Sequence, residues 1–364
     1  MRKSVATGLA FGGIAKPELA AQAVERAMEK SGIKSPTAVL LFLSAEFASD
    51  PESSIKAAAK AASCTQIIGC SATGIFTEED WILDSPAAAA MIFDDSITLN
   101  VKINKPHSEL LMTLAAPSAM NSTWLSKPGL RFGGISGDAI GQGPFSVWEN
   151  GKGATQGYCD IAFQNTKTAV AASHGLKRLS DPQKISKANG YDLVMVDDTF
   201  AVNHLETAWQ LFNKQTQDIP LHQIVAIYAG NQNALLQGEY NVASIIACDE
   251  TCGTVTLSKP LTQNDWVCWA IRDVNAAQID IVKTATALGQ QLEDEPTFAL
   301  LFSCLGRGPS FYDGSDQDLE LLKTLFPNLP IIGFYGNGEI APIAEKSEML
   351  QYSAVIALFL EETK

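Results

Sequence analysis

The sequence predicts an α/β protein in which helices flank mixed sheets, arranged as two similar units on either side of a β-rich middle region. Apolar runs of strand length alternate with amphipathic helical patterns, and this alternation is typical of helices packed on a sheet. Hydrophobic residues make up 46% of the chain and charged residues 18%, the composition of an ordinary folded protein. At 364 residues the chain is long enough for two or three domains.

The first unit, about residues 1–105, has a β-α-β-α-β-β pattern. The helix over 17–30 is amphipathic, and the run that ends at Ser44 is too uniformly apolar for a half-exposed strand. In chain order we expect a strand at Val5–Ala10, a helix at Pro17–Lys30, the strand ending at Ser44, a helix at Pro51–Ala62, a glycine-punctuated strand from Ile67, and a strand at Ala87–Phe93.

The second unit, about residues 262–364, repeats this order. PTFALLFSC from Pro296 matches PTAVLLFLS from Pro36, and Ile331-Ile332-Gly333 matches Ile67-Ile68-Gly69. Its expected elements are a strand at Trp266–Ile271, a helix at Ala276–Leu292, the strand ending at Cys304, a helix at Asp316–Phe326, a strand from Ile331 and a strand at Ser353–Leu360. The middle region predicts strands at 160–163, 168–173, 193–196 and 224–228, and a helix at 200–213.

Composition excludes several partners. The net charge of −14 argues against nucleic acid, and no apolar run is long enough to cross a bilayer. Seven cysteines, an odd number mostly inside apolar runs, indicate free thiols in a reducing compartment, so we expect a cytoplasmic protein. Gly336, Gly338 and Ala341 spell a short dinucleotide fingerprint, but Pro342 follows and leaves no room for the helix that such a site needs.

The candidate binding residues lie where the signature strands end. Glycines beside Arg307 let backbone N–H groups approach a ligand, and the guanidinium can hold a carboxylate, while Glu339 can meet an ammonium group. We therefore predict one pocket for a small polar metabolite such as an amino acid; the alternative is that Arg307 pairs with Glu339 and locks two loops. The candidates are Cys304, Gly306, Arg307, Gly308, Tyr335, Asn337 and Glu339 in the second unit, and Cys70, Ser71 and Thr73 in the first.

Several of these motifs resemble the FIST-domain family. FSCLGRG (302–308) and IIGFYGNGEIAP (331–342) are similar to its C-terminal signature, IIGCSATGIF (67–76) to its N-terminal one, and LRFGGISGD (130–138) and the stretch over 173–203 to the rest of its N-terminal domain. The resemblance implies a FIST N-terminal domain at 1–203 and a FIST C-terminal domain at 204–364. It also implies a sensory, ligand-binding protein without catalysis that reports to a separate signalling protein such as a histidine kinase.

Two other functions stay open. Some stand-alone relatives are associated with haem and nitric-oxide sensing, and His174 is the residue we would expect as an axial ligand in that case. A cysteine-dependent hydrolase would use Cys70 or Cys304, but neither signature contains the His that would activate a thiol. We expect no metal site, and no cofactor unless haem is bound.

Overall fold

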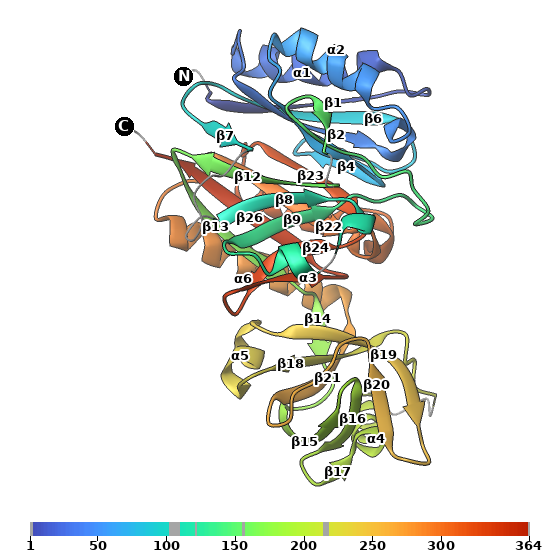
Figure 1. The fold of residues 1–364 in the computed structure, drawn as a ribbon. Helices are drawn as coiled ribbons and strands as arrows, with labels where there is room; N and C mark the ends of the chain where they lie inside the picture. Colours follow the sequence, from blue (N-terminus) through green and yellow to red (C-terminus); the bar gives the residue numbers. More distant parts are fainter. Residues whose placement is uncertain (1–2, 102–109, 121, 155–156, 214–217, 363–364) are drawn as a thin grey trace. The chain divides into compact units, whose positions relative to one another are not determined.

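The computed structural model describes residues 3–101, 110–120, 122–154, 157–213 and 218–362 (Figure 1). The chain forms two compact units, a larger one from residues 1–173 and 281–364 and a smaller one from residues 174–280. Mixed sheets with several helices confirm the predicted α/β class.

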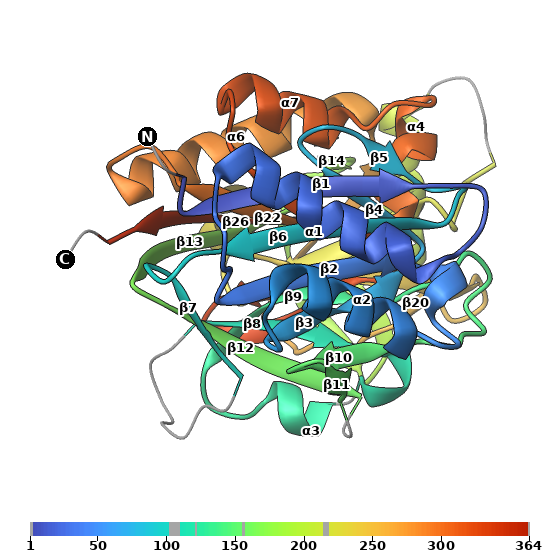
Figure 2. The ribbon, with the colours of Figure 1, turned by 90° about the horizontal axis from the view of Figure 1, so that it is seen from above.

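The first sheet of the larger unit is covered by two helices on one face. In spatial order its strands are β1 (Val5–Phe11), β6 (Ala87–Phe93), β2 (Ala38–Ser44), β3 (Ile67–Ala72), β10 (Val147–Glu149) and β11 (Lys152–Gly153), and the pair β2–β3 is parallel. Helices α1 (Pro17–Ser31) and α2 (Glu52–Ala62) lie over this sheet (Figure 2). Gly8 permits the contact with α1, because a Cβ there would lie 2.1 Å from the carbonyl oxygen of Ala23.

The second sheet, like the first, has a parallel pair of strands at its centre. Its order is β13 (Thr166–Ser173), β26 (Ala354–Glu361), β22 (Phe298–Cys304), β23 (Ile331–Gly336), β4 (Gly74–Thr77) and β5 (Trp81–Ile82), and β22–β23 is parallel. The outer face packs against α7 (Gln317–Leu325) and the part of α6 (Val274–Leu292) that follows Asp280. The side chain of Asp316 caps α7 by accepting the N–H of Leu319 at 3.0 Å.

A third sheet completes the larger unit. Its order is β25 (Lys346–Leu350), β24 (Glu339–Ile343), β9 (Leu130–Ile135), β8 (Leu110–Ala115), β12 (Tyr158–Gln164) and β7 (Thr98–Asn100). The inner faces of the three sheets share one core, in which the rings of Phe42 and Phe334 lie 4.9 Å apart. Short helical turns complete the connections: η1 (Ala45–Phe47), η2 (Pro117–Ala119), α3 (Ser122–Leu125), η3 (Leu305–Arg307) and η4 (Pro309–Tyr312).

Buried strands in this unit alternate between two cores, which explains why their sequences are uniformly apolar. Val39, Leu41 and Leu43 face the helices, whereas Leu40 and Phe42 of the same strand face the shared core. Both faces of β2 are therefore removed from water, as the sequence predicts.

The smaller unit is a closed antiparallel barrel with helices. Strand β21 (Trp266–Arg272) pairs with both β15 (Gln183–Asn189) and β18 (Ile224–Ala229), so the sheet returns to its first strand. Helix α4 (Ala201–Phe212) contributes to its core. The other elements are β14 (Leu176–Arg178), β16 (Asp192–Val196), β17 (Thr199–Phe200), α5 (Gln232–Gln237), β19 (Asn241–Asp249) and β20 (Thr254–Leu257).

One predicted element has a different place. The strand over Trp266–Ile271 forms, but the prediction that it opens the second unit is wrong, because β21 is hydrogen-bonded along both edges within the barrel. The position beside β26 belongs to β13, which pairs with β26 through all eight of its residues. The internal repeat of the sequence stays a prediction.

Candidate functional site

The two glycine-rich signatures are corners at which the chain passes from one sheet to the next. After β3 ends in the first sheet, Thr73 turns the chain into β4 of the second sheet. After β23 ends in the second sheet, Asn337 and Gly338 turn the chain into β24 of the third sheet. The corners are neighbours, since the N–H of Thr73 donates to the carbonyl oxygen of Tyr335 at 3.2 Å.

The signature glycines allow the sheets to approach closely at these corners. A Cβ on Gly336 would lie 2.2 Å from the carbonyl oxygen of Ile135 in the third sheet. Gly69 instead permits a close contact inside the first sheet, since a Cβ there would lie 1.7 Å from the carbonyl oxygen of Leu41 on the neighbouring strand β2. Gly338 also adopts a φ of 146°, which side chains rarely tolerate. A strand rather than a helix follows Gly338, so the short fingerprint is not a dinucleotide loop.

Three residues at the corners form what we call the cradle: Thr73, Gly137 and Asn337. A Cβ on Gly137 would lie 2.9 Å from both the hydroxyl oxygen of Thr73 and the amide oxygen of Asn337, so both polar atoms flank the same position. Thr73 is 8% exposed, and its Oγ1 has no hydrogen-bond partner among the described residues. An unpaired buried hydroxyl is costly, and a polar ligand atom or a water would satisfy it.

A serine network holds the wall beside the cradle. The hydroxyl of Ser136 donates to the carbonyl oxygen of Ser71 at 2.6 Å, and the two hydroxyl oxygens lie 3.1 Å apart. The N–H of Ser146 donates to the Ser71 hydroxyl at 3.0 Å. These contacts fix both ends of the loop that contains Gly137.

The carboxylate of Asp138 fixes the middle of the same loop. It accepts backbone N–H groups from Gly141, from Gln142 at 3.2 Å and from Gly143 at 2.8 Å. Sequence reasoning did not select Gly137 or Asp138 as site residues. The signal was the polar SGD that directly follows strand β9, a strand end comparable to the two that were selected.

Arg307 is held by an internal ion pair. Its Nε donates to Asp318 at 2.8 Å and its Nη2 donates to the same carboxylate at 3.1 Å. The carbonyl oxygen and the hydroxyl of Ser173 accept two further bonds, at 2.7 and 2.9 Å, and Tyr312 donates to Asp318 at 2.7 Å. The side chains of Arg307 and Asp318 are only 2% and 1% exposed, so this pair lies fully inside the protein.

Glu339 is not the ion-pair partner of Arg307 among the described residues, although the two are close enough to interact electrostatically. Its carboxyl is completely buried, and its Oε2 accepts the hydroxyl of Ser353 at 2.6 Å and the N–H of Ser353 at 3.3 Å. Within the described part of the chain, Oε1 has no partner. Burial raises the pKa of Glu339 well above its ordinary value, against the opposing effects of Ser353 and the Arg307 charge, and this favours the neutral carboxyl.

Tyr335 joins the same interior. Its hydroxyl donates to Asp316, and burial, followed by the charge of Asp318, raises the pKa of Asp316 to about 6. Its ring lies against Gly308, where a Cβ would be 3.1 Å from Cδ1. Strands β22 and β23 are neighbours, with Cys304 opposite Gly336, so the two predicted strand ends lie side by side as expected.

The predicted cysteines are buried. Cys70 lies in the shared core, and burial raises the pKa of its thiol well above the ordinary value. Cys304 is 7% exposed at the end of β22, and Gly306 follows it in a half-buried turn. A nucleophilic cysteine needs an accessible thiolate, and the surroundings of Cys70 oppose one.

His174 lies in the smaller unit. It is 5% exposed, and its ring stacks on that of Tyr240 with centroids 4.6 Å apart. Its backbone N–H donates to Asp280 at 2.8 Å. A haem iron requires an imidazole nitrogen that opens on a space wide enough for a porphyrin, and this packed environment does not fit one.

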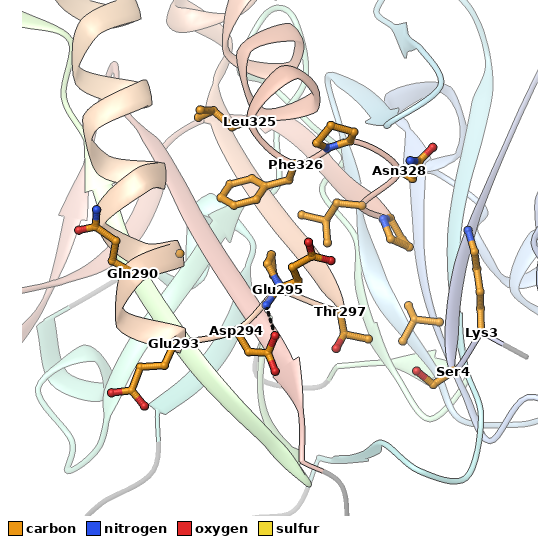
Figure 3. A pocket seen from close by; sticks show the side chains of 16 residues that line it. Lys3, Ser4, Gln290, Glu293, Asp294, Glu295, Thr297, Leu325, Phe326 and Asn328 are labelled. Carbon is orange, nitrogen blue, oxygen red and sulfur yellow. Dashed lines mark hydrogen bonds between the residues drawn. The ribbon is translucent and has the colours of Figure 1, made fainter. Parts of the chain in front are cut away.

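Three cavities lined by described residues of the larger unit lie away from the predicted site residues. One of about 990 Å³ surrounds the loops that precede β22 and β23, at the opposite ends of those strands from Cys304 and Gly336 (Figure 3). A second, of about 780 Å³, lies beside 125–130 and 345–348, and a third, of about 250 Å³, lies between the start of α2 and β10. Across the described ranges, no helix combines the length and the apolarity that a membrane span requires.

Comparison with known proteins identifies the class. A model of the FIST N domain matches residues 37–199 and a model of the FIST C domain matches residues 200–342. The chain therefore belongs to the FIST family. The matched domains divide the chain at 199/200, whereas the compact units divide it at 173/174 and 280/281.

Individual relatives are distant. The uncharacterized protein MT0656 of Mycobacterium tuberculosis is 20% identical over 367 residues, which cover 94% of this chain and 96% of that protein. The uncharacterized protein Mb0898c of Mycobacterium bovis is 21% identical over 232 residues, 63% of this chain and 60% of that protein. A segment of 64 residues is 36% identical to F-box only protein 22 of Homo sapiens and covers 16% of each chain.

Proposed function

We propose that this chain is a sensory protein that binds a small polar metabolite at the cradle. FIST domains are associated with sensory and signal-transduction roles, and this supports the class of function. The observation that carries the site is the buried Thr73 hydroxyl, which has no hydrogen-bond partner among the described residues and lies with the Asn337 amide against Gly137.

The ligand presents a neutral amide or hydroxyl group to these side chains. Thr73 and Asn337 both donate and accept hydrogen bonds without carrying charge. The sequence predicted that Arg307 would hold an anionic group of the ligand. Its guanidinium instead donates hydrogen bonds to Asp318 and Ser173 inside the protein. The carboxylate of Asp138 is likewise occupied by backbone N–H groups. An amino acid remains a suitable ligand where its side chain, such as a carboxamide, enters the cradle.

Binding rather than catalysis is proposed because the three cradle residues include no base that could activate the Thr73 hydroxyl, and Cys70 is buried with a raised thiol pKa. The ligand signal would then pass to a separate signalling protein, for which a histidine kinase is one candidate class. The cradle lies between the two corners at which the chain passes among the three sheets, so a ligand bound there would contact residues that connect all three.

The test begins with native mass spectrometry of the purified protein, which detects a retained ligand as mass lost on denaturation. A thermal-shift panel of amino acids, primary amides and polyols follows, applied to the wild type, Thr73→Val and Asn337→Ala. The matched control is Thr65→Val, an exposed threonine on another loop. We expect a ligand of the wild type to bind Thr73→Val about tenfold more weakly, the effect of losing one buried hydrogen bond.

The control should bind the ligand like the wild type. If Thr73→Val and Asn337→Ala both retain wild-type affinity, the cradle is not the binding site. If no compound in the panel binds and no mass is lost on denaturation, the proposal of a small-molecule sensor is refuted for these ligand classes.

A further inference from the structure

The cavity of about 990 Å³ at the other end of the second sheet combines an apolar floor with a rim that carries three carboxylates and one lysine, Lys3, and we call it the acidic groove. It is bounded by the C-terminal ends of α6 and α7 and by the start of β1 (Figure 3). Phe326 and Leu325 at the end of α7 form part of the floor, and the Phe326 ring lies 3.3 Å from the position a Cβ would take on Gly289. Val5, Leu329 and Pro330 extend the apolar surface.

The rim carries three consecutive carboxylates. Glu293, Asp294 and Glu295 follow α6 directly and are all exposed. Lys167 lies 3.5 Å from Glu293, whereas no ion pair is formed by Asp294 or Glu295 within the described part of the chain. The C-terminal end of a helix carries partial negative charge, and α6 has no basic residue in its last turn to offset it.

We propose that the acidic groove docks a basic segment of a partner protein, with apolar side chains on the floor and Lys or Arg side chains on the rim. Protein interfaces usually combine an apolar centre with complementary charges at the rim, and the acidic groove offers both. A small cation would need a buried counter-charge to be held tightly, but these carboxylates are exposed. The inference goes beyond the proposed function, because the groove and the cradle share no residue.

The probe is a fluorescein-labelled peptide, Arg-Leu-Lys-Leu-Arg-Leu, titrated with the full chain and followed by fluorescence anisotropy. A second peptide with Glu in place of Arg and Lys reports the need for positive charge. The groove variant combines Glu293→Gln, Asp294→Asn and Glu295→Gln. The control variant removes the same charges from exposed sites elsewhere and combines Glu25→Gln, Asp95→Asn and Glu29→Gln.

We expect the basic peptide to bind the wild type and the control equally, and the groove variant about tenfold more weakly. Binding to the wild type should also weaken as salt rises from about 50 to about 300 mM, because exposed charges are screened. Phe326→Ala should weaken binding at both salt concentrations, since it removes the floor; its thermal midpoint is measured alongside to confirm folding.

Equal loss of binding in the groove and control variants would show that only net charge matters and would overturn the proposal. So would equal binding of the basic and acidic peptides, or no binding of the basic peptide by the wild type. None of these outcomes depends on the cradle, so a failure here is distinguishable from a failure of the sensor proposal.

Discussion

Replacing Arg307 by Met should destabilise the larger unit rather than act primarily on a ligand site. Met keeps an unbranched apolar stem but removes every guanidinium donor. Asp318, 1% exposed, would then keep the Tyr312 hydroxyl but lose both bonds from Arg307. Ser173 would lose two donors as well.

The magnitude follows from burial. Removing one partner of a buried ion pair costs about 3–5 kcal/mol, because the remaining charge stays in a medium that solvates it poorly. For a unit of this size, a loss of that order lowers the thermal midpoint by roughly 6–20 °C. The double variant Arg307→Met/Asp318→Leu should be more stable than Arg307→Met, since no unpaired carboxylate is left behind.

The assay is a double-mutant cycle by urea unfolding, with thermal midpoints measured in parallel. The control is Lys56→Met, which breaks an ion pair to Glu52 whose side chains are 73% and 69% exposed, and it should leave the midpoint unchanged. The reasoning is refuted if Arg307→Met keeps the wild-type midpoint but loses ligand binding. That result would restore Arg307 as a ligand anchor.

Three further predictions concern buried titratable groups. Because burial raises the pKa of Glu339, Glu339→Gln should lose under about 1 kcal/mol of unfolding free energy and Glu339→Ala about 2–4, measured in urea; similar losses would contradict a neutral carboxyl. The pKa of Asp316 rises to about 6 in the folded state from an ordinary 3.8, so this group's stabilising contribution is present below about pH 4 and is lost as pH rises through 6. In urea titrations at several pH values, Asp316→Asn should therefore gain stability relative to the wild type between pH 4 and pH 7, and a constant difference would contradict this. Iodoacetamide should label exposed Cys252 in the native protein well before buried Cys70 or Cys159, by peptide mass mapping; equally fast labelling of Cys70 would revive the thiol-enzyme alternative.

Periodicity predicted the longer helices and the central strands of the first two sheets because these elements carry a local signal, whereas β8, β9, β24 and β25 of the third sheet were not predicted. The uniform apolarity of β2 and β22 reflects burial on both faces, and the amphipathic pattern of α1 reflects burial on one. Sheet membership carries no comparable signal. Trp266–Arg272 has the composition of a core strand in either unit, and only its hydrogen-bonded neighbours place it in the barrel.

The site was predicted less well, because partner choice depends on the tertiary fold. The sequence indicated that Arg307 would find an anion but could not say which one. Its partner Asp318 lies in the first turn of α7, on the face that the fold turns toward Arg307. Thr73 and Asn337 were selected for their positions at strand ends, whereas their convergence over Gly137 depends on how the end of β9 meets two corners.

The corners give the signature glycines a structural reason that also bears on sensing. The corner after β23 needs glycine because Gly336 lies at backbone distance from Ile135 of the third sheet, so the sequence there is constrained before any ligand is considered. A buried polar group without a hydrogen-bond partner lowers the stability of the fold, and packing alone gives no reason for a hydroxyl rather than an apolar side chain at position 73. The role of the cradle can be tested by replacing Gly137 with alanine. The added methyl would lie 2.9 Å from the polar atoms of Thr73 and Asn337 and displace the atoms that a ligand would meet. A junction with one unsatisfied buried hydroxyl is suited to transmit binding to the sheets, because a ligand changes the hydrogen bonding at the point where they are joined.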